Sequence, residues 1–169
     1  MWVAFFRNLN LGQPRSPSRS QLVDAFGAEG ATDVLSHQVN GTVAFATAGD
    51  PQALADAVAA RLGPVCGYAD VAPVRSLEWL AGLGLDDLPD GCELTVFDGP
   101  SPFPEPLPWT PSADVTVLAA DGDHAIVQNH VERRSQGTRV VEARLGVRAT
   151  SRGVGTVQRL LARLGTSSG

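Results

Sequence analysis

The feature that most constrains the fold is the stretch Trp2–Gly12, which reads WVAFFRNLNLG. Its first five residues, Trp2–Phe6, are all apolar. A short continuous apolar run of this kind is typical of a central strand that is buried on both faces. The polar residues that follow place one guanidinium and two carboxamides at the carboxyl end of this strand. Because this end of a sheet is a frequent ligand site, we interpret Arg7–Gly12 as the first candidate site.

Two local signals in the residues that follow predict a helix and a hairpin. Ser18 and Gln21 have the spacing of a capping box, so a helix is predicted to begin after Ser18 and to stop at Gly30. The dipeptide Asn40-Gly41 predicts a hairpin with a type I′ turn, since both residues accept positive φ. The strands on either side of this turn are expected at residues 33–37 and 42–48.

A second helix is predicted from Asp50, as N-cap, to Gly63-Pro64, where glycine and proline would end it. A fourth strand is expected at residues 68–74. The order of elements is then β-α-β-β-α-β, which is the split β-α-β arrangement of ferredoxin-like domains.

The second half is predicted to repeat the same kinds of element. Ser76 caps a short helix, and residues 100–111 contain six prolines, which predicts an extended loop in place of a helix. The fold class is therefore α+β, with two ferredoxin-like lobes, mainly antiparallel sheets and helices packed on one face. The expected domains are 1–75 and 76–165, followed by a flexible tail at 166–169. Strands are predicted at 92–97, 115–119, 125–128 and 147–149, and helices at 138–145 and near the C-terminus.

Charge is divided unevenly along the chain. Residues 1–120 hold five Arg and fourteen acids, a balance of −9, whereas residues 121–169 hold eight Arg and four acids, a balance of +4. The basic second part indicates an anionic partner, and the alternative is a solvated basic face. All 13 basic residues are Arg, which excludes a P-loop lysine. Cys66 and Cys92 have no companion ligand pattern, so two buried thiols are favoured over a disulfide or a metal site.

No segment resembles a targeting or membrane signal. The N-terminal apolar run is five residues long and has no basic lead, unlike a signal peptide. No stretch approaches the roughly 18 apolar residues of a membrane span. We therefore expect a cytoplasmic protein, a monomer or homodimer, without membrane contact.

The second candidate site is Thr150–Thr156, which is expected to precede and enter the last helix. Backbone N–H groups at a helix N-terminus attract anions, and Arg152 would add a bidentate guanidinium. In the alternative interpretation Ser151 only caps the helix and the glycines form a turn. Common catalytic signatures are absent from the sequence, and His37, His124 and His130 are interpreted as ordinary polar side chains. We predict no catalytic residue, no metal and no cofactor.

Three stretches resemble the motifs of a bacterial family called domain of unknown function 1697 (DUF1697). Its members show Arg-Gly-Ile-Asn-Val-Gly-Gly after the first strand, Ser-Gly-Asn-Val-Val-Phe at the hairpin and Thr-Thr-Arg-Asn-Trp-Asn-Thr-Val near the C-terminus. Here the corresponding residues are 7–13, 40–45 and 150–157, with Asn-Trp-Asn replaced by Gly-Val-Gly. The resemblance to this family implies a two-lobed α+β fold and no established reaction. The positions that match are Arg7, Asn10, Gly12, Gly41, Arg152 and Thr156.

Three functional hypotheses follow. The first is non-catalytic binding of a small anionic or phosphate-bearing ligand in a cleft between the end of the first strand and the start of the last helix. The second is RNA binding, because Ala4–Leu9 resembles the first-strand signature of RNA-recognition domains, although only Phe45 remains of the third-strand aromatics. The third, ranked last, is a hydrolase or transferase acting on a phosphorylated substrate. The predicted ligand-binding residues are Arg7, Asn8, Asn10, Gly12, Asn40, Gly41, Thr42, Ser151, Arg152, Gly153 and Thr156.

Overall fold

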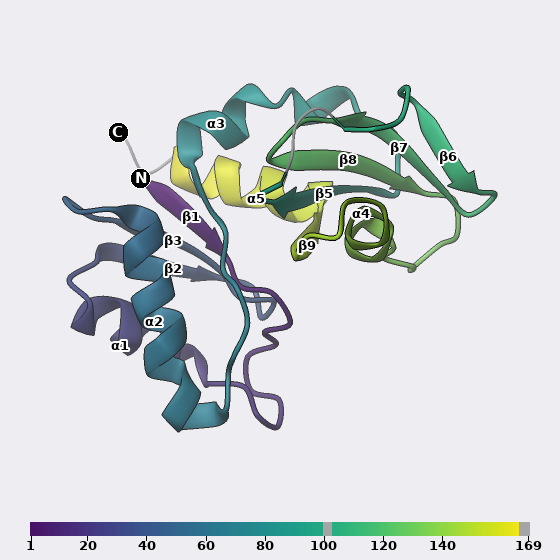
Figure 1. Cartoon of the computed structure of the whole chain (residues 1–169). Coiled ribbons are helices and arrows are strands. Elements are labelled where there is room, and N and C mark those ends of the chain that lie inside the picture. Colours follow the sequence, from purple (N-terminus) through teal and green to yellow (C-terminus); the bar gives the residue numbers. More distant parts are fainter. Residues whose placement is uncertain (100–102, 166–169) are drawn as a thin grey trace. The chain divides into compact units, whose positions relative to one another are not determined.

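The computed structural model describes residues 1–99 and 103–165 and divides into two compact units, Met1–Leu80 and Ala81–Gly169 (Figure 1). Each unit holds one antiparallel sheet together with helices, so the predicted α+β fold class is confirmed. The domain boundary expected at residue 75 stays a prediction. The expected tail at 166–169 and residues 100–102 of the proline-rich loop lie outside the described residues.

The first unit is organised around strand β1 (Trp2–Phe5). This strand pairs with β3 (Thr42–Ala46) on one side and with β4 (Val74–Ser76) on the other, while β2 (Thr32–His37) forms the far edge. The sheet order is β2-β3-β1-β4, and every neighbouring pair is antiparallel. A central position for the apolar run is therefore confirmed.

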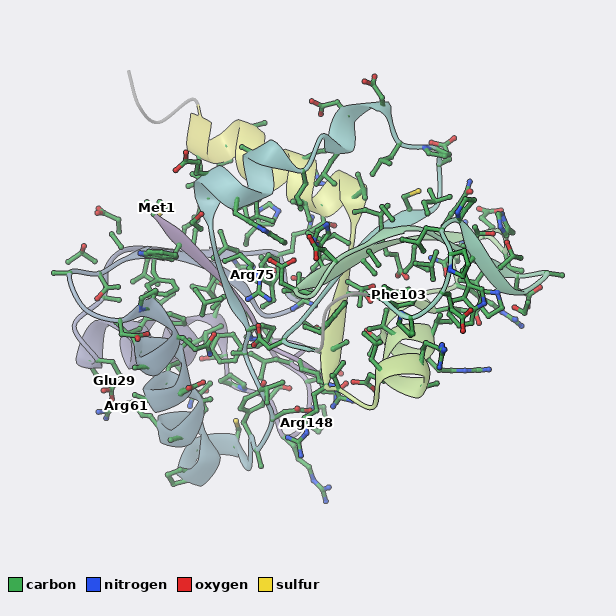
Figure 2. The ribbon with its side chains drawn as sticks, turned by 45° about the horizontal axis from the view of Figure 1, so that its top comes forward. Met1, Glu29, Arg61, Arg75, Phe103 and Arg148 are labelled. Atoms are coloured by element: carbon green, nitrogen blue, oxygen red, sulfur yellow. The ribbon has the colours of Figure 1, made fainter. Side chains whose placement is uncertain are left out.

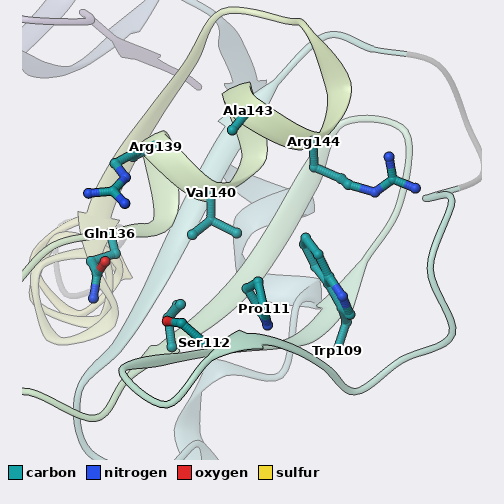
Figure 3. Close-up of a pocket in the computed structure, with 9 residues that line it drawn as sticks. Trp109, Pro111, Ser112, Gln136, Arg139, Val140, Ala143 and Arg144 are labelled. Carbon is teal, nitrogen blue, oxygen red and sulfur yellow. The ribbon is translucent and has the colours of Figure 1, made fainter.

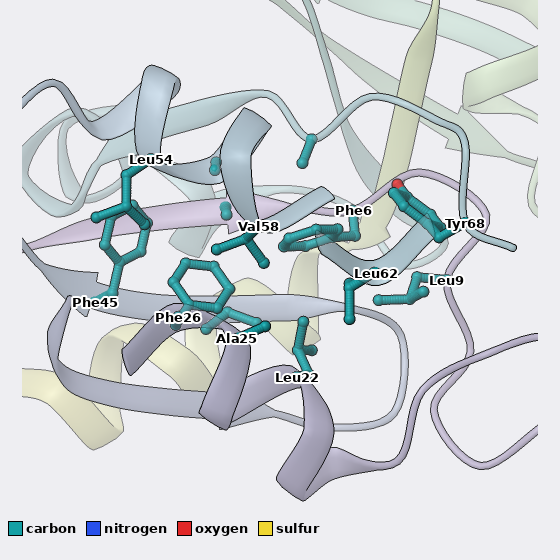
Figure 4. Close-up of a cluster of buried hydrophobic side chains, with 14 of the residues drawn as sticks. Phe6, Leu9, Leu22, Ala25, Phe26, Phe45, Leu54, Val58, Leu62 and Tyr68 are labelled. Carbon is teal, nitrogen blue, oxygen red and sulfur yellow. The ribbon is translucent and has the colours of Figure 1, made fainter. Parts of the chain in front are cut away.

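Helices α1 (Arg19–Ala28) and α2 (Pro51–Cys66) begin at the predicted caps. The Ser18 hydroxyl accepts from the Gln21 N–H at 3.2 Å, and the Gln21 side chain accepts from the Ser18 N–H at 2.8 Å, which completes the capping box. Both helices cover the same face of the sheet. The core between them contains the aromatic side chains of Phe6, Phe26, Phe45 and Tyr68 (Figure 4). An exposed ion pair between Arg61 and Glu29 joins the two helices at their surface, with Nη2 and Oε1 2.6 Å apart (Figure 2).

One turn type and two element boundaries are predicted wrongly in the first unit. The hairpin loop has four residues, and positive φ occurs at Gln38 and Gly41 but not at Asn40, so the turn is not type I′. Helix α2 continues through Pro64 and ends only at the left-handed Gly67, whose N–H donates to the Gly63 carbonyl. The fourth strand was predicted at residues 68–74 but occupies Val74–Ser76. The residues before it form a loop, whose Val71 and Pro73 carbonyls accept from the N–H groups of Arg7 and Phe5.

The sheet of the second unit has the order β6-β7-β8-β5-β9. Without the edge strand β6, the order β7-β8-β5-β9 repeats the pattern of the first unit, as expected from the order of elements. Helix α4 (Gly137–Leu145) lies on one face of the sheet and buries Val141 in its core. Short α3 (Leu77–Gly82) and the 3-10 helix η1 (Leu85–Asp87) precede the sheet. The strands are β5 (Cys92–Phe97), β6 (Trp109–Ser112), β7 (Val115–Ala120), β8 (His124–Asn129) and β9 (Ala149–Gly153).

Two differences from the sequence prediction affect the candidate site. Strand β6 lies at the end of the stretch expected to be only a loop, where Trp109 pairs with Val117. Strand β9 occupies Ala149–Gly153 instead of residues 147–149, so α5 (Val154–Gly165) starts later than expected. As a result, Ser151 and Arg152 are strand residues that pair with β5 and do not cap a helix.

No helix within the described ranges has the length and apolar character needed to cross a membrane.

Candidate functional site

A groove of about 250 Å³ lies between helix α4 and strands β6 and β7 of the second unit (Figure 3). We call it the α4 groove. Its floor is apolar, and polar side chains stand at its rim. The residues that line it are Trp109, Pro111, Ser112, Val115, Gln136, Arg139, Val140, Ala143 and Arg144.

Helical spacing explains why five of these residues share one side of the groove. Gln136 is the N-cap of α4, and residues 139, 140, 143 and 144 follow at intervals of three, four, seven and eight. Side chains at these intervals lie on the same face of an α-helix. The opposite wall comes from the edge of the sheet, where Pro111 has no N–H to donate to a ladder. The pairing of β6 with β7 is irregular between Trp109 and Ser112.

The two arginines of the rim differ in their partners. The Arg144 Nη2 lies 2.5 Å from the Glu105 Oε1, so its charge is largely balanced. Arg139 is exposed and forms no ion pair with any described residue. The groove therefore offers one guanidinium that can meet an incoming acid.

Gln136 also lines the groove, but its donor does not face the open space. Its side-chain nitrogen Nε2 is buried and has no hydrogen-bond partner among the described residues. A buried donor without an acceptor destabilises the fold by about 1–3 kcal/mol. A ligand in the groove could accept from this nitrogen only if the Gln136 side chain turned outward.

A buried carboxylate holds the start of α4 in place. The Glu93 Oε2 accepts from the backbone N–H groups of Gln136 at 3.2 Å and Gly137 at 2.9 Å. The Asn129 Oδ1 also accepts from the Gln136 N–H, at 3.0 Å. A negative charge at a helix N-terminus is favourable, so this contact fixes the position of Gln136 in the groove.

The predicted residues that follow β1 are mostly engaged within the first unit. The Arg7 Nη1 donates to the Asp70 Oδ2 at 2.6 Å, and the Asn8 Nδ2 donates to the same oxygen at 2.8 Å. Asn10 is exposed, and Gly12 has a φ of +77°. An anion that approaches Arg7 would therefore compete with Asp70.

The predicted hairpin residues do lie beside the loop that follows β1. The Phe6 N–H donates to the Gly41 carbonyl at 2.9 Å, and an added Cβ on Gly41 would lie 2.9 Å from the Leu9 Cβ. The Thr42 hydroxyl donates to the Asn40 Oδ1 at 2.8 Å. These contacts pack the hairpin loop against the loop that follows β1, so the predicted hairpin residues have a structural role.

The predicted C-terminal residues belong to the second unit and do not form an open helix N-terminus. Arg152 is only 6% exposed, and its Nη1 donates to the Thr150 hydroxyl and to the Ser151 carbonyl, both at 2.8 Å. The Ser151 hydroxyl shares hydrogen bonds with the hydroxyls of Thr95 at 2.8 Å and Thr138 at 2.9 Å. Gly153 ends β9 and Thr156 lies in α5, where the Thr156 hydroxyl accepts from Arg159 at 3.2 Å.

The predicted meeting of Arg7 with Arg152 joins residues of two separately described units, so it stays a prediction. The α4 groove was missed by the sequence analysis, although Trp109 and the arginines of α4 were visible in the sequence. The available signals were a tryptophan that follows a proline-rich stretch and the basic balance of residues 121–169, which contain Arg139 and Arg144.

Both cysteines are free thiols, and Cys66 is only partly buried. Burial, with smaller contributions from Asp90 and Glu93, raises the pKa of the Cys92 thiol. No group of three or more possible metal ligands occurs in the described ranges.

A family model described as "Protein of unknown function (DUF1697)" matches residues 1–91, more than half of the chain. The chain belongs to the DUF1697 family. The part of this DUF1697 protein that matches the family model includes the motifs at residues 7–13 and 40–45. The motif at residues 150–157 lies outside the matched part.

A comparison with curated proteins gives no match for this DUF1697 chain. Among solved structures, it is similar to a conserved bacterial protein, SP0830, from Streptococcus pneumoniae. The two are 14% identical, with a TM-score of 0.64 over 97% of each chain. At this level of identity the similarity shows a common fold and no more.

Proposed function

We propose that this DUF1697 protein binds a small molecule with an acidic group in the α4 groove. The observation that carries the proposal is Arg139, an exposed guanidinium that lines the groove and has no ion pair among the described residues. Charge-assisted hydrogen bonds are the strongest that such a rim can offer, and an acid can accept them from Arg139. Apolar walls with a few convergent polar groups are typical of small-molecule sites.

A binding role is favoured over catalysis. The residues that line the groove include no histidine and no carboxylate. The acid nearest to Ser112 in the sequence is Asp114, whose backbone N–H donates to the Ser112 hydroxyl at 3.3 Å while its carboxylate pairs with Arg134. An RNA-binding role is less favoured, because Phe45 packs against Phe26 at 5.0 Å between ring centroids, on the face that the helices cover. A base-stacking ring would need the opposite face of the sheet.

Calorimetric titration of the whole chain with acetate, inorganic phosphate and 3-phenylpropionate tests the proposal. We expect at least one of these acids to bind, and Arg139→Gln to weaken it by about tenfold, since a hydrogen bond to a charged group contributes about 1.5–3 kcal/mol and solvent reduces this at an exposed residue. Arg133→Gln is the matched control, because the Arg133 side chain is 90% exposed and lies outside the groove.

Two results would overturn the proposal. One is the absence of a binding heat for all three acids at millimolar concentration. The other is binding that survives Arg139→Gln but is lost in Arg7→Gln, which would move the ligand to the loop predicted from the sequence and away from the α4 groove.

A further inference from the structure

We infer that the ligand of the α4 groove is a small aromatic monocarboxylic acid, with its ring against Trp109 and its carboxylate at Arg139. This inference rests on the proposed function of the groove and names the chemical class of its ligand. Figure 3 shows Arg139 and Gln136 at one end of the groove, Trp109 and Arg144 at the other, and Val140 between them.

The end at Trp109 suits a flat unsaturated ring. The indole is seen nearly edge-on in Figure 3, so one of its faces turns toward Pro111 and Val140. Phe103 supports the indole with a ring-centroid distance of 5.9 Å and an interplanar angle of 56°. A ligand ring that packs on the Trp109 indole is stabilised by the aromatic contact as well as by the burial of its apolar surface.

The opposite end suits one carboxylate. Arg144 is balanced by Glu105, so Arg139 is the only lining cation that has no ion pair among the described residues. A carboxylate carries a single charge, whereas a phosphate monoester carries about −1.5 to −2 at pH 7 and would leave charge unpaired. The two carboxylate oxygens can accept from the planar Arg139 guanidinium as a bidentate pair.

The volume of the groove limits the size of the ligand. It is about 250 Å³, just below the range of about 300–1,000 Å³ that is typical of drug-sized ligands. A compound with one ring and a short acidic chain has a size that this space admits.

Four compounds of similar size test the inference on the whole chain by calorimetry: 3-phenylpropionate, 3-cyclohexylpropionate, 3-phenylpropanol and phenyl phosphate. We expect 3-phenylpropionate to bind most tightly. Its advantage over the cyclohexyl acid should be about 2- to 12-fold, as an aromatic contact of about 0.5–1.5 kcal/mol implies. Trp109→Leu, which keeps an apolar side chain, should remove this advantage, and Trp109→Phe should retain most of it.

The outcomes separate this inference from the proposed function. Equal binding of the phenyl and cyclohexyl acids, or an advantage that persists in Trp109→Leu, would overturn the aromatic ligand and leave acid binding intact. Tighter binding of phenyl phosphate would overturn the monocarboxylate. Binding of 3-phenylpropanol as tight as that of the acid would contradict the proposed function itself. If Trp109→Leu fails to fold, the comparison of the two acids on the unaltered chain still decides the question.

Discussion

Replacing Gly137 with Ala should destabilise the protein, although the same change in most helices is stabilising. An ideal Cβ on Gly137 would lie 2.3 Å from the Thr95 Oγ1, 2.9 Å from the Ser151 Oγ and 3.0 Å from the Glu93 Oε2. The Thr95 side chain has 0% exposure and shares a hydrogen bond with the Ser151 hydroxyl at 2.8 Å, so it has no free space to move into. The carboxylate that holds the start of α4 would also be displaced.

The expected loss of unfolding free energy is about 1–3 kcal/mol, the range for overpacking a closed interior. It should exceed the gain of up to about 1 kcal/mol that alanine brings relative to glycine in a helix. Urea unfolding followed by far-UV circular dichroism measures the difference. Gly155→Ala in α5 is the matched control in the same unit, because its Cβ would meet only the flexible end of Arg159 at 3.4 Å. The reasoning is refuted if Gly137→Ala unfolds at the same urea concentration as the unaltered chain or at a higher one.

Four further predictions concern other parts of the chain. Ser18→Ala should lower the unfolding free energy by about 1 kcal/mol in urea titrations, because it removes the N-cap of α1, and no change would contradict the capping box. Gly41→Ala should lower it by more than about 1–2 kcal/mol, the penalty for a left-handed backbone alone, since Gly41 has a φ of +68° and its Cβ would also meet two side-chain β-carbons at 2.9 Å. Iodoacetamide at pH 8 should modify Cys66 before Cys92 in the folded protein, and the reverse order in peptide mass analysis would be evidence against a raised Cys92 pKa. Because the folded state holds the Cys92 proton more tightly than the unfolded state, stability should fall above about pH 8.5, and this fall should be smaller in Cys92→Ala.

Local signals in the sequence predicted the elements that are built from local hydrogen bonds. The Ser18 capping box and the Asp50 N-cap involve residues only three positions apart, and the structure contains both. The apolar run Trp2–Phe6 likewise predicted a buried central strand, because burial on both faces requires a continuous apolar sequence.

The predictions of the hairpin turn and of the last strand are wrong because contacts between residues far apart in the sequence determine the backbone conformation there. The hairpin loop is shaped by the close approach of Gly41 to Phe6 and Leu9, which overrides the preference of Asn-Gly for a type I′ turn. The position of β9 is set by its pairing with β5, where Arg152 lies opposite Leu94. No spacing within the last fifty residues encodes that register.

The candidate site shows the same limit. Arg7 is a candidate in the sequence because it follows a strand end, but its partner Asp70 is 63 residues away. The α4 groove combines Trp109 with a helix that begins at Gly137, and Glu93 fixes that helix from a third segment. The unequal distribution of arginine did point to the half of the chain that contains Arg139.

The central claim is that an acid enters the α4 groove between Arg139 and Trp109. The most direct test is the indole N–H signal of Trp109 in the NMR spectrum of the ¹⁵N-labelled chain during titration with 3-phenylpropionate, with the signal assigned through Trp109→Phe. We expect a saturable shift of the Trp109 signal, with a midpoint moved to about tenfold higher concentration in Arg139→Gln and unchanged in Arg133→Gln. A Trp109 signal that stays in place while the ligand binds elsewhere, or a midpoint that Arg139→Gln leaves unaltered, would contradict it.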